Sequence, residues 1–248
     1  MPYRLFNLEE VAKYLHLSCP DIEKLVKDQE IPFERRGERI VFVRQAIDAW
    51  ASQRILGLSE RRLAEYHQKS TRDVGEIFPD QAMMPRLIQP ERIATAMTSK
   101  TKASVIRDIV ALADKTGAVA NAKDLLESLE AREELCPTAI PGGLALLHAR
   151  HQQPFLFESS FLLLGRTLQE IHFGSPDGHP TDLFFLLCCQ DDRLHLHTLA
   201  RLCLLAMETD VLAQLRQAPD AQSMYDGLIA CETAVLARKD EARNRRLR

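Results

Sequence analysis

The sequence lacks several features that would assign it to a class at once. Its six cysteines are scattered without a C-x-x-C spacing, which argues against a zinc finger and against a disulfide framework. Its net charge is only −3, so no overall basic field would hold nucleic acid or an anionic membrane. Its apolar runs, among them residues 183–189 and 161–164, are far too short to cross a bilayer.

Other absences narrow the class further. The first ten residues carry charge early and contain no secretory hydrophobic segment, and the thiols form no framework, so we expect a reduced cytoplasmic protein. With 46% hydrophobic and 27% charged residues in 248, the composition is that of a globular protein, and the length is sufficient for two domains. No cofactor and no bound metal are expected.

Two capped helices begin the chain. Asn7 precedes Leu8 with Glu10 three residues on, and Ser18 precedes the next pattern with Asp21 three residues on. Both are capping-box spacings. Apolar residues recur at helical intervals after each cap. These patterns predict two consecutive helices within the first 30 residues.

A small hairpin and a third helix are predicted next. In residues 31–43, two apolar stretches flank a charged block that contains Gly37, which is typical of two strands joined by a glycine turn. Residues 44–50 then predict a short helix. Through the phrases LEEVAKYLHLS, EIPFERRGERIVF and AIDAW, residues 1–54 resemble the excisionase and MerR-like family. That resemblance implies a winged helix-turn-helix domain.

Charge leaves the partner of this first domain open. Residues 1–54 carry nine basic and nine acidic side chains, which is a poor electrostatic footprint for DNA. Asp21 and Glu23, at the start of the second helix, would repel phosphates. The candidate DNA contacts are Lys24, Lys27, Arg35, Arg36 and Arg39. The alternative is a protein-interaction module whose wing arginines only face solvent.

The rest of the chain predicts a linker, a larger domain and a tail. We interpret residues 55–86 as a partly helical linker, with a helix available for self-association, and residues 237–248 as a charged tail. Helices and short apolar strands interleave over residues 87–236, which implies an α/β fold. The expected helices are 90–97, 102–116, 122–132, 194–207, 210–217 and 221–237, and the expected strands are 161–164 and 183–188.

The run REELCPTAIPGGLALLHAR at residues 132–150 is similar to a motif of the type-2 EIIA domains of the sugar phosphotransferase system. Further similarity follows in order at SPDGHPTDLFFLL and LHLHTLARL. The resemblance implies an α/β (α+β) domain with a mixed sheet flanked by helices. The positions that match within the first run are Arg132, Thr138, Ile140, Gly143, Ala145 and His148.

The resemblance also implies roles for these residues. His148 would accept a phosphoryl group from an HPr-type carrier, and a neutral imidazole is a good nucleophile near pH 7. Arg132 would compensate the phosphoryl charge through its guanidinium. His195 matches the second histidine of such sites, and Thr138 would add a hydroxyl contact. Flexible glycines 142 and 143 would let backbone N–H groups approach an anion.

Each residue also has a plainer interpretation. A lone histidine is usually solvated or structural, and Arg132 could be a cation at a helix C-terminus. His195 and His197 are two residues apart, so only one of them can point into a site. A metal site at His148 and His151 is disfavoured, because no cysteine or carboxylate lies at a suitable spacing.

The motif departs from the family pattern at four positions: Pro137, Ala139, Pro141 and Leu147. Three functions follow as hypotheses. The chain is a regulator whose phosphorylation is coupled to DNA or protein binding, a phosphocarrier that serves a separate EIIB, or a degenerate module that only binds proteins.

Overall fold

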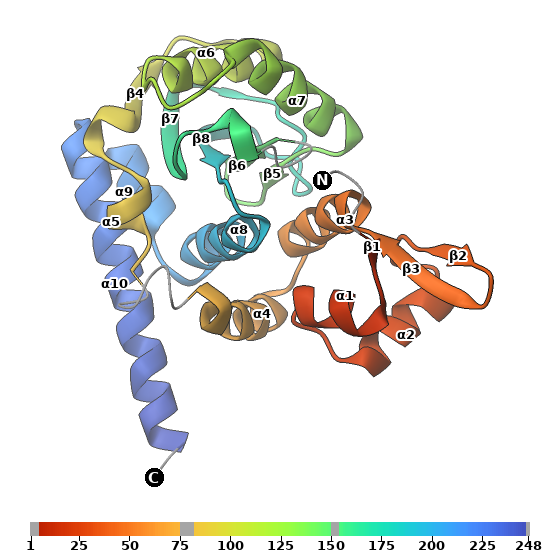
Figure 1. Cartoon of the computed structure of the whole chain (residues 1–248). Coiled ribbons are helices and arrows are strands. Elements are labelled where there is room, and N and C mark those ends of the chain that lie inside the picture. Colours follow the sequence, from red (N-terminus) through yellow and green to blue (C-terminus); the bar gives the residue numbers. More distant parts are fainter. Residues whose placement is uncertain (1–4, 75–81, 150–153, 247–248) are drawn as a thin grey trace.

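The first unit is a helix-turn-helix followed by a hairpin and a third helix. The computed structural model describes residues 5–74, 82–149 and 154–246 (Figure 1). Both predicted capping boxes are present, since Asn7 caps Glu10 and Ser18 caps Asp21. Gly37 takes φ +63° in the hairpin turn. The elements are β1 (Leu5–Phe6), α1 (Leu8–Tyr14), α2 (Cys19–Lys27), β2 (Glu34–Arg36), β3 (Arg39–Val43) and α3 (Arg44–Leu56).

The larger unit is a mixed five-stranded sheet between helices. The strand order is β4-β7-β8-β6-β5, with parallel pairs β4–β7 and β6–β8 and antiparallel pairs β7–β8 and β5–β6. Its strands are β4 (Ile93–Met97), β5 (Ala139–Ile140), β6 (Leu144–His148), β7 (Phe161–Ile171) and β8 (Thr181–Cys188). Its helices are α5 (Met84–Leu87), α6 (Lys102–Asp114), α7 (Ala122–Leu135), α8 (Asp192–Glu208), α9 (Val211–Gln217) and α10 (Ala221–Arg246), with 3-10 turns at Pro90–Arg92 and Pro154–Leu156.

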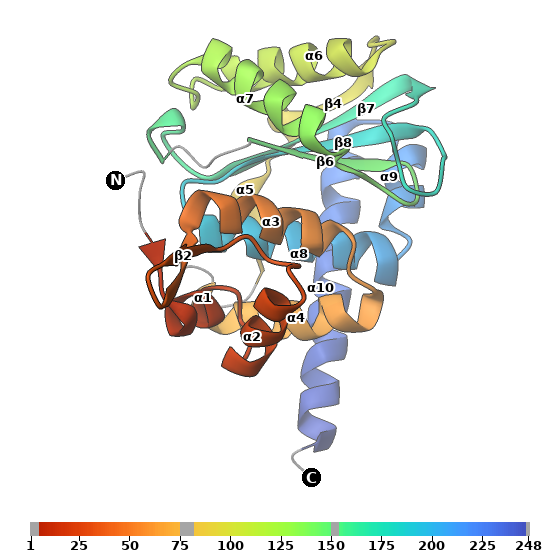
Figure 2. The same cartoon turned by 90° about the vertical axis from the view of Figure 1, so that its right-hand side faces the viewer.

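The central strand β8 explains the longest apolar run. Phe184 and Leu186 pack toward α6 and α7, whereas Leu183, Phe185 and Leu187 pack toward α8. A strand covered by helices on both faces has no solvent-facing side, so its sequence shows no alternation. Figure 2 shows the resulting layers, with α6 and α7 above the sheet and α8 below it.

One expected helix is wrong. Residues 90–97 were expected to be helical, but they form a 3-10 turn at Pro90–Arg92 and then the edge strand β4. Ile93 and Met97, the buried residues of β4, belong to the two apolar clusters on opposite faces of the sheet, and the register with β7 shifts between Ala94 and Met97. Pairing with β7 makes this segment a strand.

The segment after the first unit joins the core. Helix α4 (Glu60–Val74) lies within the expected linker, and it packs against α8 of the same chain. Its buried residues Leu63, His67 and Ser70 follow the i, i+4, i+7 spacing of one helix face. One apolar cluster runs without a break from Val11 in α1 to Val235 in α10. The two units therefore share a core.

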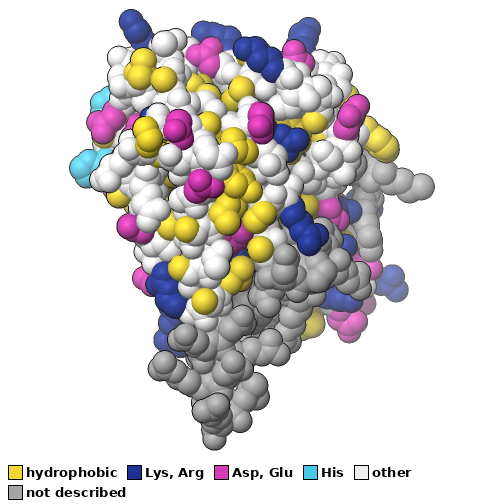
Figure 3. All heavy atoms as spheres, turned by 90° about the vertical axis from the view of Figure 1, so that its left-hand side faces the viewer, with side chains coloured by type: hydrophobic (Ala, Val, Ile, Leu, Met, Phe, Trp, Pro, Cys, Tyr) yellow, Lys and Arg dark blue, Asp and Glu magenta, His cyan; other side chains and the backbone are white. Residues whose placement is uncertain are grey.

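The face formed by α10 shows mixed character. Hydrophobic side chains follow an interrupted stripe there, between acidic and basic ones (Figure 3). The half-buried residues Tyr225 and Ile229 belong to α10. Of the helices within the described ranges, none has the length and apolar content needed to span a membrane.

Candidate functional site

His148 is the last residue of β6, at the edge of the sheet face that α8 covers. Its backbone is paired with Leu187 of β8, and its side chain is 2% exposed. The Nδ1 atom lies 2.8 Å from the carbonyl oxygen of Leu146. Because a carbonyl can only accept a hydrogen bond, Nδ1 carries the proton there. The lone pair of the neutral ring is then on Nε2.

Arg132 reaches His148 from the last turn of α7. Its Nε donates to Nε2 of His148 at 3.1 Å, and its Nη1 donates to the carbonyl oxygen of Cys136 at 2.8 Å. Its Nη2 is buried and has no hydrogen-bond partner among the described residues. A guanidinium offers five donors in a planar fork that matches carboxylate and phosphate oxygens. The site therefore contains a buried guanidinium whose Nη2 can still donate hydrogen bonds to a ligand.

His195 stands beside His148 on the first turns of α8. Asp191 caps this helix by accepting hydrogen bonds from the backbone N–H groups of Arg193 and Leu194. The rings of His148 and His195 lie 4.9 Å apart, centroid to centroid. The Nδ1 atom of His195 is buried and has no hydrogen-bond partner among the described residues. The sequence motif and the structure thus bring Arg132, His148 and His195 together.

His197 points elsewhere, as its two-residue offset from His195 requires. Its Nδ1 lies 2.6 Å from Oγ of Ser70, and its ring stacks on that of His67 at 4.4 Å. Helix α4 therefore holds His197, while His195 faces the sheet edge.

Burial keeps both site histidines neutral. It lowers the pKa of His148 well below its usual range, and nearby His195 and Arg132 lower it further, while the hydrogen bond to Leu146 opposes the change. Burial also lowers the pKa of His195 to about 3, with a smaller contribution from Arg132. At neutral pH the nucleophilic form of His148 is therefore the populated one.

Thr138 supports the site from a distance. Its hydroxyl donates to Oε2 of Glu133 at 2.6 Å, and its backbone N–H also donates to that carboxylate. Lys102 adds an ion pair to Glu133, with Nζ 2.7 Å from Oε1. Glu133 thus ties the end of α7 to the start of β5, next to the residue that carries the guanidinium. The hydroxyl of Thr138 therefore binds Glu133 and does not contact His148.

The glycine expectation is wrong. Gly142 and Gly143 form the turn between β5 and β6, with φ +93° and +78°. They lie at the far end of β6, which at ~3.3 Å per residue separates Gly143 from His148 by roughly 16 Å. The N–H of Gly142 donates to Asp177, and its carbonyl accepts from Arg216. A Cβ on Gly143 would lie 2.5 Å from Nη2 of Arg216, so the glycines permit a tight turn.

The expected DNA contacts lie on an exposed part of the first unit. Lys24 and Lys27 project from α2, and Arg35, Arg36 and Arg39 from the hairpin, all of them exposed. Arg36 is paired with Glu34 at 3.0 Å. The hairpin extends away from the rest of the molecule (Figure 1).

Ser52 is a site neighbour that the sequence did not reveal. It lies on α3, is 3% exposed, and has its Oγ 3.4 Å from Nε2 of His195. Serine in a helix carries no pattern that points to a partner 143 residues away. Only the docking of α3 on α8 brings the two together.

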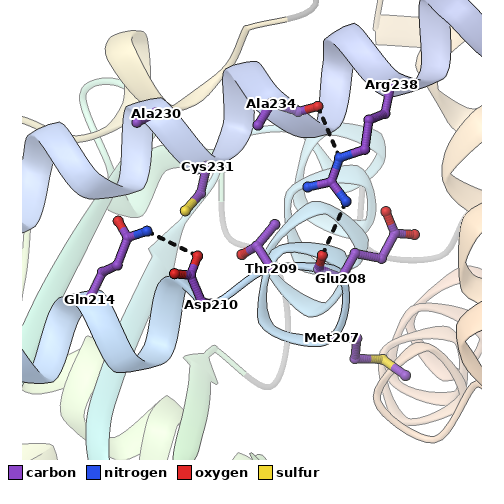
Figure 4. A pocket seen from close by; sticks show the side chains of 9 residues that line it. All are labelled: Met207, Glu208, Thr209, Asp210, Gln214, Ala230, Cys231, Ala234 and Arg238. Atoms are coloured by element: carbon purple, nitrogen blue, oxygen red, sulfur yellow. Dashed lines mark hydrogen bonds between the residues drawn. The ribbon is translucent and has the colours of Figure 1, made fainter.

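Two hollows elsewhere offer no comparable chemistry. One of about 550 Å³ lies between the end of α8, α9 and α10 (Figure 4). Its polar groups bind one another: Gln214 donates to Asp210, and Arg238 donates to the carbonyl oxygen of Glu208. A groove of about 500 Å³ between α2, α3 and α4 is lined by Trp50, Arg54 and residues of mixed charge.

Metal ligands do not gather in the described part of the chain, where no three His, Cys, Asp or Glu side chains form a group that could hold an ion. His151, the second member of the disfavoured pair with His148, lies outside the described residues.

The fold and the site define an α/β domain with a buried histidine pair and an arginine, joined to a helix-turn-helix. Residues 86–230 match the family described as phosphoenolpyruvate-dependent sugar phosphotransferase system, EIIA 2, and residues 5–55 match a helix-turn-helix domain. The chain belongs to this EIIA type-2 family, with a helix-turn-helix domain before it.

Known relatives agree with this assignment. A nitrogen regulatory protein of Bradyrhizobium diazoefficiens is 34% identical over 145 residues, which cover 57% of this chain and 92% of the relative. A nitrogen regulatory protein of Pseudomonas aeruginosa is 29% identical over 147 residues, which cover 57% of this chain and 92% of the relative. The crystal structure of IIA mannitol from Escherichia coli has a TM-score of 0.50 at 17% identity, and covers 57% of this chain and 98% of that one. The crystal structure of a IIA domain from Streptococcus pyogenes has a TM-score of 0.51 at 17% identity, and covers 60% of this chain and 96% of that one. These structures share the fold.

Proposed function

We propose that the EIIA domain accepts a phosphoryl group from an HPr-type carrier on Nε2 of His148. The observation that carries this proposal is the buried pair of Arg132 and His148. The ring is neutral, its proton lies on the nitrogen that faces Leu146, and its lone pair faces a guanidinium. A nucleophile and a cation are thus held next to each other before any donor arrives.

The transfer can be written with these groups. The lone pair of Nε2 attacks phosphorus in line with the bond to the carrier's nitrogen, and that bond breaks with its electron pair left on the carrier. Arg132 turns its donors from Nε2 to the phosphoryl oxygens, and Nη2 is free among the described residues to take one of them. The carbonyl of Leu146 keeps the Nδ1 proton and stabilises the positive charge that the ring acquires.

One departure from the family motif, Leu147, has a position that is compatible with this chemistry. Leu147 replaces the usual proline, and its side chain is buried among the residues under α6 and α7. His148 follows it on the strand and faces the opposite side, toward α8. The substituted position is therefore part of the sheet core, which supports an active site over a degenerate one.

The test is phosphorylation from labelled phosphoenolpyruvate with enzyme I and an HPr-type carrier, on wild type and His148→Ala. We expect label on the wild type alone. Absence of label on the wild type would overturn the proposed acceptor function, and equal label on both would move the acceptor away from His148.

We further propose that the helix-turn-helix domain binds DNA, so that the protein couples phosphotransfer to transcription. The match of residues 5–55 to a helix-turn-helix domain supports it, as does the exposure of the wing arginines. The second helix of such a domain enters the major groove, and basic wings contact the backbone. A gel-shift at low and moderate salt tests this, and no shift at either salt would favour a protein partner.

A further inference from the structure

Helix α8 is buried on every side around the histidine site. All residues from Leu194 to Leu205 are buried. The sheet covers one side of this helix, and α3 and α4 cover the other (Figure 2). A helix at the surface of a domain keeps a polar, exposed face. Helices α3 and α4 lie before the EIIA match at residues 86–230, so the N-terminal segment hides a face of the phosphotransfer domain.

The covering contacts are specific and include the site itself. Oγ of Ser52, on α3, lies 3.4 Å from Nε2 of His195. Along α4, Ser70 contacts His197 at 2.6 Å, and His67 accepts from Nε of Arg201 at 2.7 Å. The α3–α4 lid, defined here as residues 44–74, therefore holds α8 through polar pairs as well as apolar ones.

A phosphorylated carrier cannot react with His148 in this arrangement. The reacting atoms must come within about 3–3.5 Å of each other. Arg132, His148 and His195 are each only 2% exposed, so a phosphorus atom on a carrier cannot come that close to Nε2 of His148 while α3 and α4 cover α8.

We propose that the α3–α4 lid and the phosphorylated carrier compete for one surface, formed by α8 and the edge of the sheet at His148. This rests on the proposed function, since it assumes that a carrier phosphorylates His148. The α3–α4 lid dissociates from α8, and the carrier then binds the exposed surface. The phosphoryl group on His148 afterwards prevents the lid from returning. A phosphoryl group carries a charge of about −1.5 to −2, and burying it again beneath Ser52 would remove its solvation.

The DNA-facing side of the first unit does not take part in this contact. Lys24, Lys27 and the wing arginines are exposed with the lid closed. Lifting the lid therefore changes how the helix-turn-helix sits on the EIIA domain, and leaves its basic residues exposed in both states. Phosphorylation would affect DNA binding by changing the orientation of the helix-turn-helix relative to the EIIA domain. It would affect the carrier by keeping the surface around His148 exposed.

The test compares phosphorylation rates of full-length proteins by a phosphorylated HPr-type carrier. Ser70→Glu places a charge in the buried interface between α4 and α8. Gln68→Glu adds the same charge on the exposed face of α4 and is the matched control. We expect Ser70→Glu to accept label at least tenfold faster than wild type, and Gln68→Glu to match wild type.

Equal rates in all three proteins would overturn the lid and leave the proposed function intact. No label on any of them would overturn both. Amide hydrogen exchange of the wild type decides the matter even if Ser70→Glu fails to fold. We expect residues 52–70 to exchange at least tenfold faster after phosphorylation, while residues 102–114 stay unchanged. Unchanged exchange in residues 52–70 would also overturn the proposal.

Discussion

Nε of Arg132 lies 3.1 Å from Nε2 of His148, and both side chains are 2% exposed. Arg132 lies in the last turn of α7 and His148 is the last residue of β6. Their contact therefore depends on how α7 packs across the sheet. The pair combines a neutral nucleophile with a fixed positive charge in a place that excludes water, where electrostatic stabilisation of a transferring group is strongest.

Arg132→Gln should slow phosphorylation of His148. Loss of one preorganised donor to a developing charge typically lowers the rate by about 10²–10³-fold. The measurement is the initial rate of labelling by the phosphorylated carrier. Arg107→Gln, at an exposed position of α6, is the control and should leave the rate unchanged. A rate within twofold of wild type in Arg132→Gln would remove the guanidinium from the mechanism.

Acid should weaken the fold through the site histidines. Burial holds the pKa of His195 at about 3 in the folded chain, against about 6.5 when unfolded. The unfolded chain therefore binds the proton first, so this stability is complete above pH 6.5 and declines as the pH falls from there toward 3. Between pH 7.5 and 5.5 the loss is about 1.4 kcal/mol for each such histidine. Urea unfolding at both pH values measures it.

His195→Asn provides the comparison for that measurement, because asparagine does not titrate. Its free energy of unfolding should fall by about 1.4 kcal/mol less than that of wild type over the same interval. An equal fall in both proteins would mean that His195 does not contribute to the acid sensitivity.

Glu232→Gln should destabilise the protein strongly. Glu232 is 1% exposed, pairs with the fully buried Arg201, and accepts backbone hydrogen bonds from Met83 and Met84. Removing one charge of a buried pair leaves the other uncompensated, which costs about 3–5 kcal/mol. Chemical denaturation measures the change. Asp226→Asn, exposed on α10, should change stability by less than about 0.5 kcal/mol; a similar effect of both substitutions would contradict the argument.

Arg39→Ala should weaken DNA binding and reduce its dependence on salt. Arg39 is exposed at the start of β3 in the wing. Each lost phosphate contact lowers the slope of log K against log salt by about 1. Binding titrations at several salt concentrations measure the slope. Arg107→Ala, on the far side of the EIIA domain, should bind as wild type; an unchanged slope in Arg39→Ala would exclude a wing–backbone contact.

Much of this structure is local enough to be predicted from sequence. The caps at Asn7 and Ser18 and the Gly37 turn depend on neighbours within a few residues, and the strand at residues 183–188 is marked by its own continuous apolar run. The helix expected at residues 90–97 was wrong, because residues 93–97 pair with β7, a strand about 70 residues further along the chain, and no pattern within a few residues reveals that partner.

Part of the candidate site could likewise be predicted from the sequence, and part depends on the tertiary structure. The motif around His148 identified Arg132 and His195 as its companions, and the two-residue offset from His197 meant that only one of these histidines could face His148. The sequence by itself determined the family, the acceptor candidate and the neutral imidazole chemistry. Only the tertiary structure decided which ring nitrogen faces the arginine, and that Ser52, His67 and Ser70 cover α8. These last contacts join segments more than 100 residues apart, and they form because buried polar groups must find partners in the assembled core.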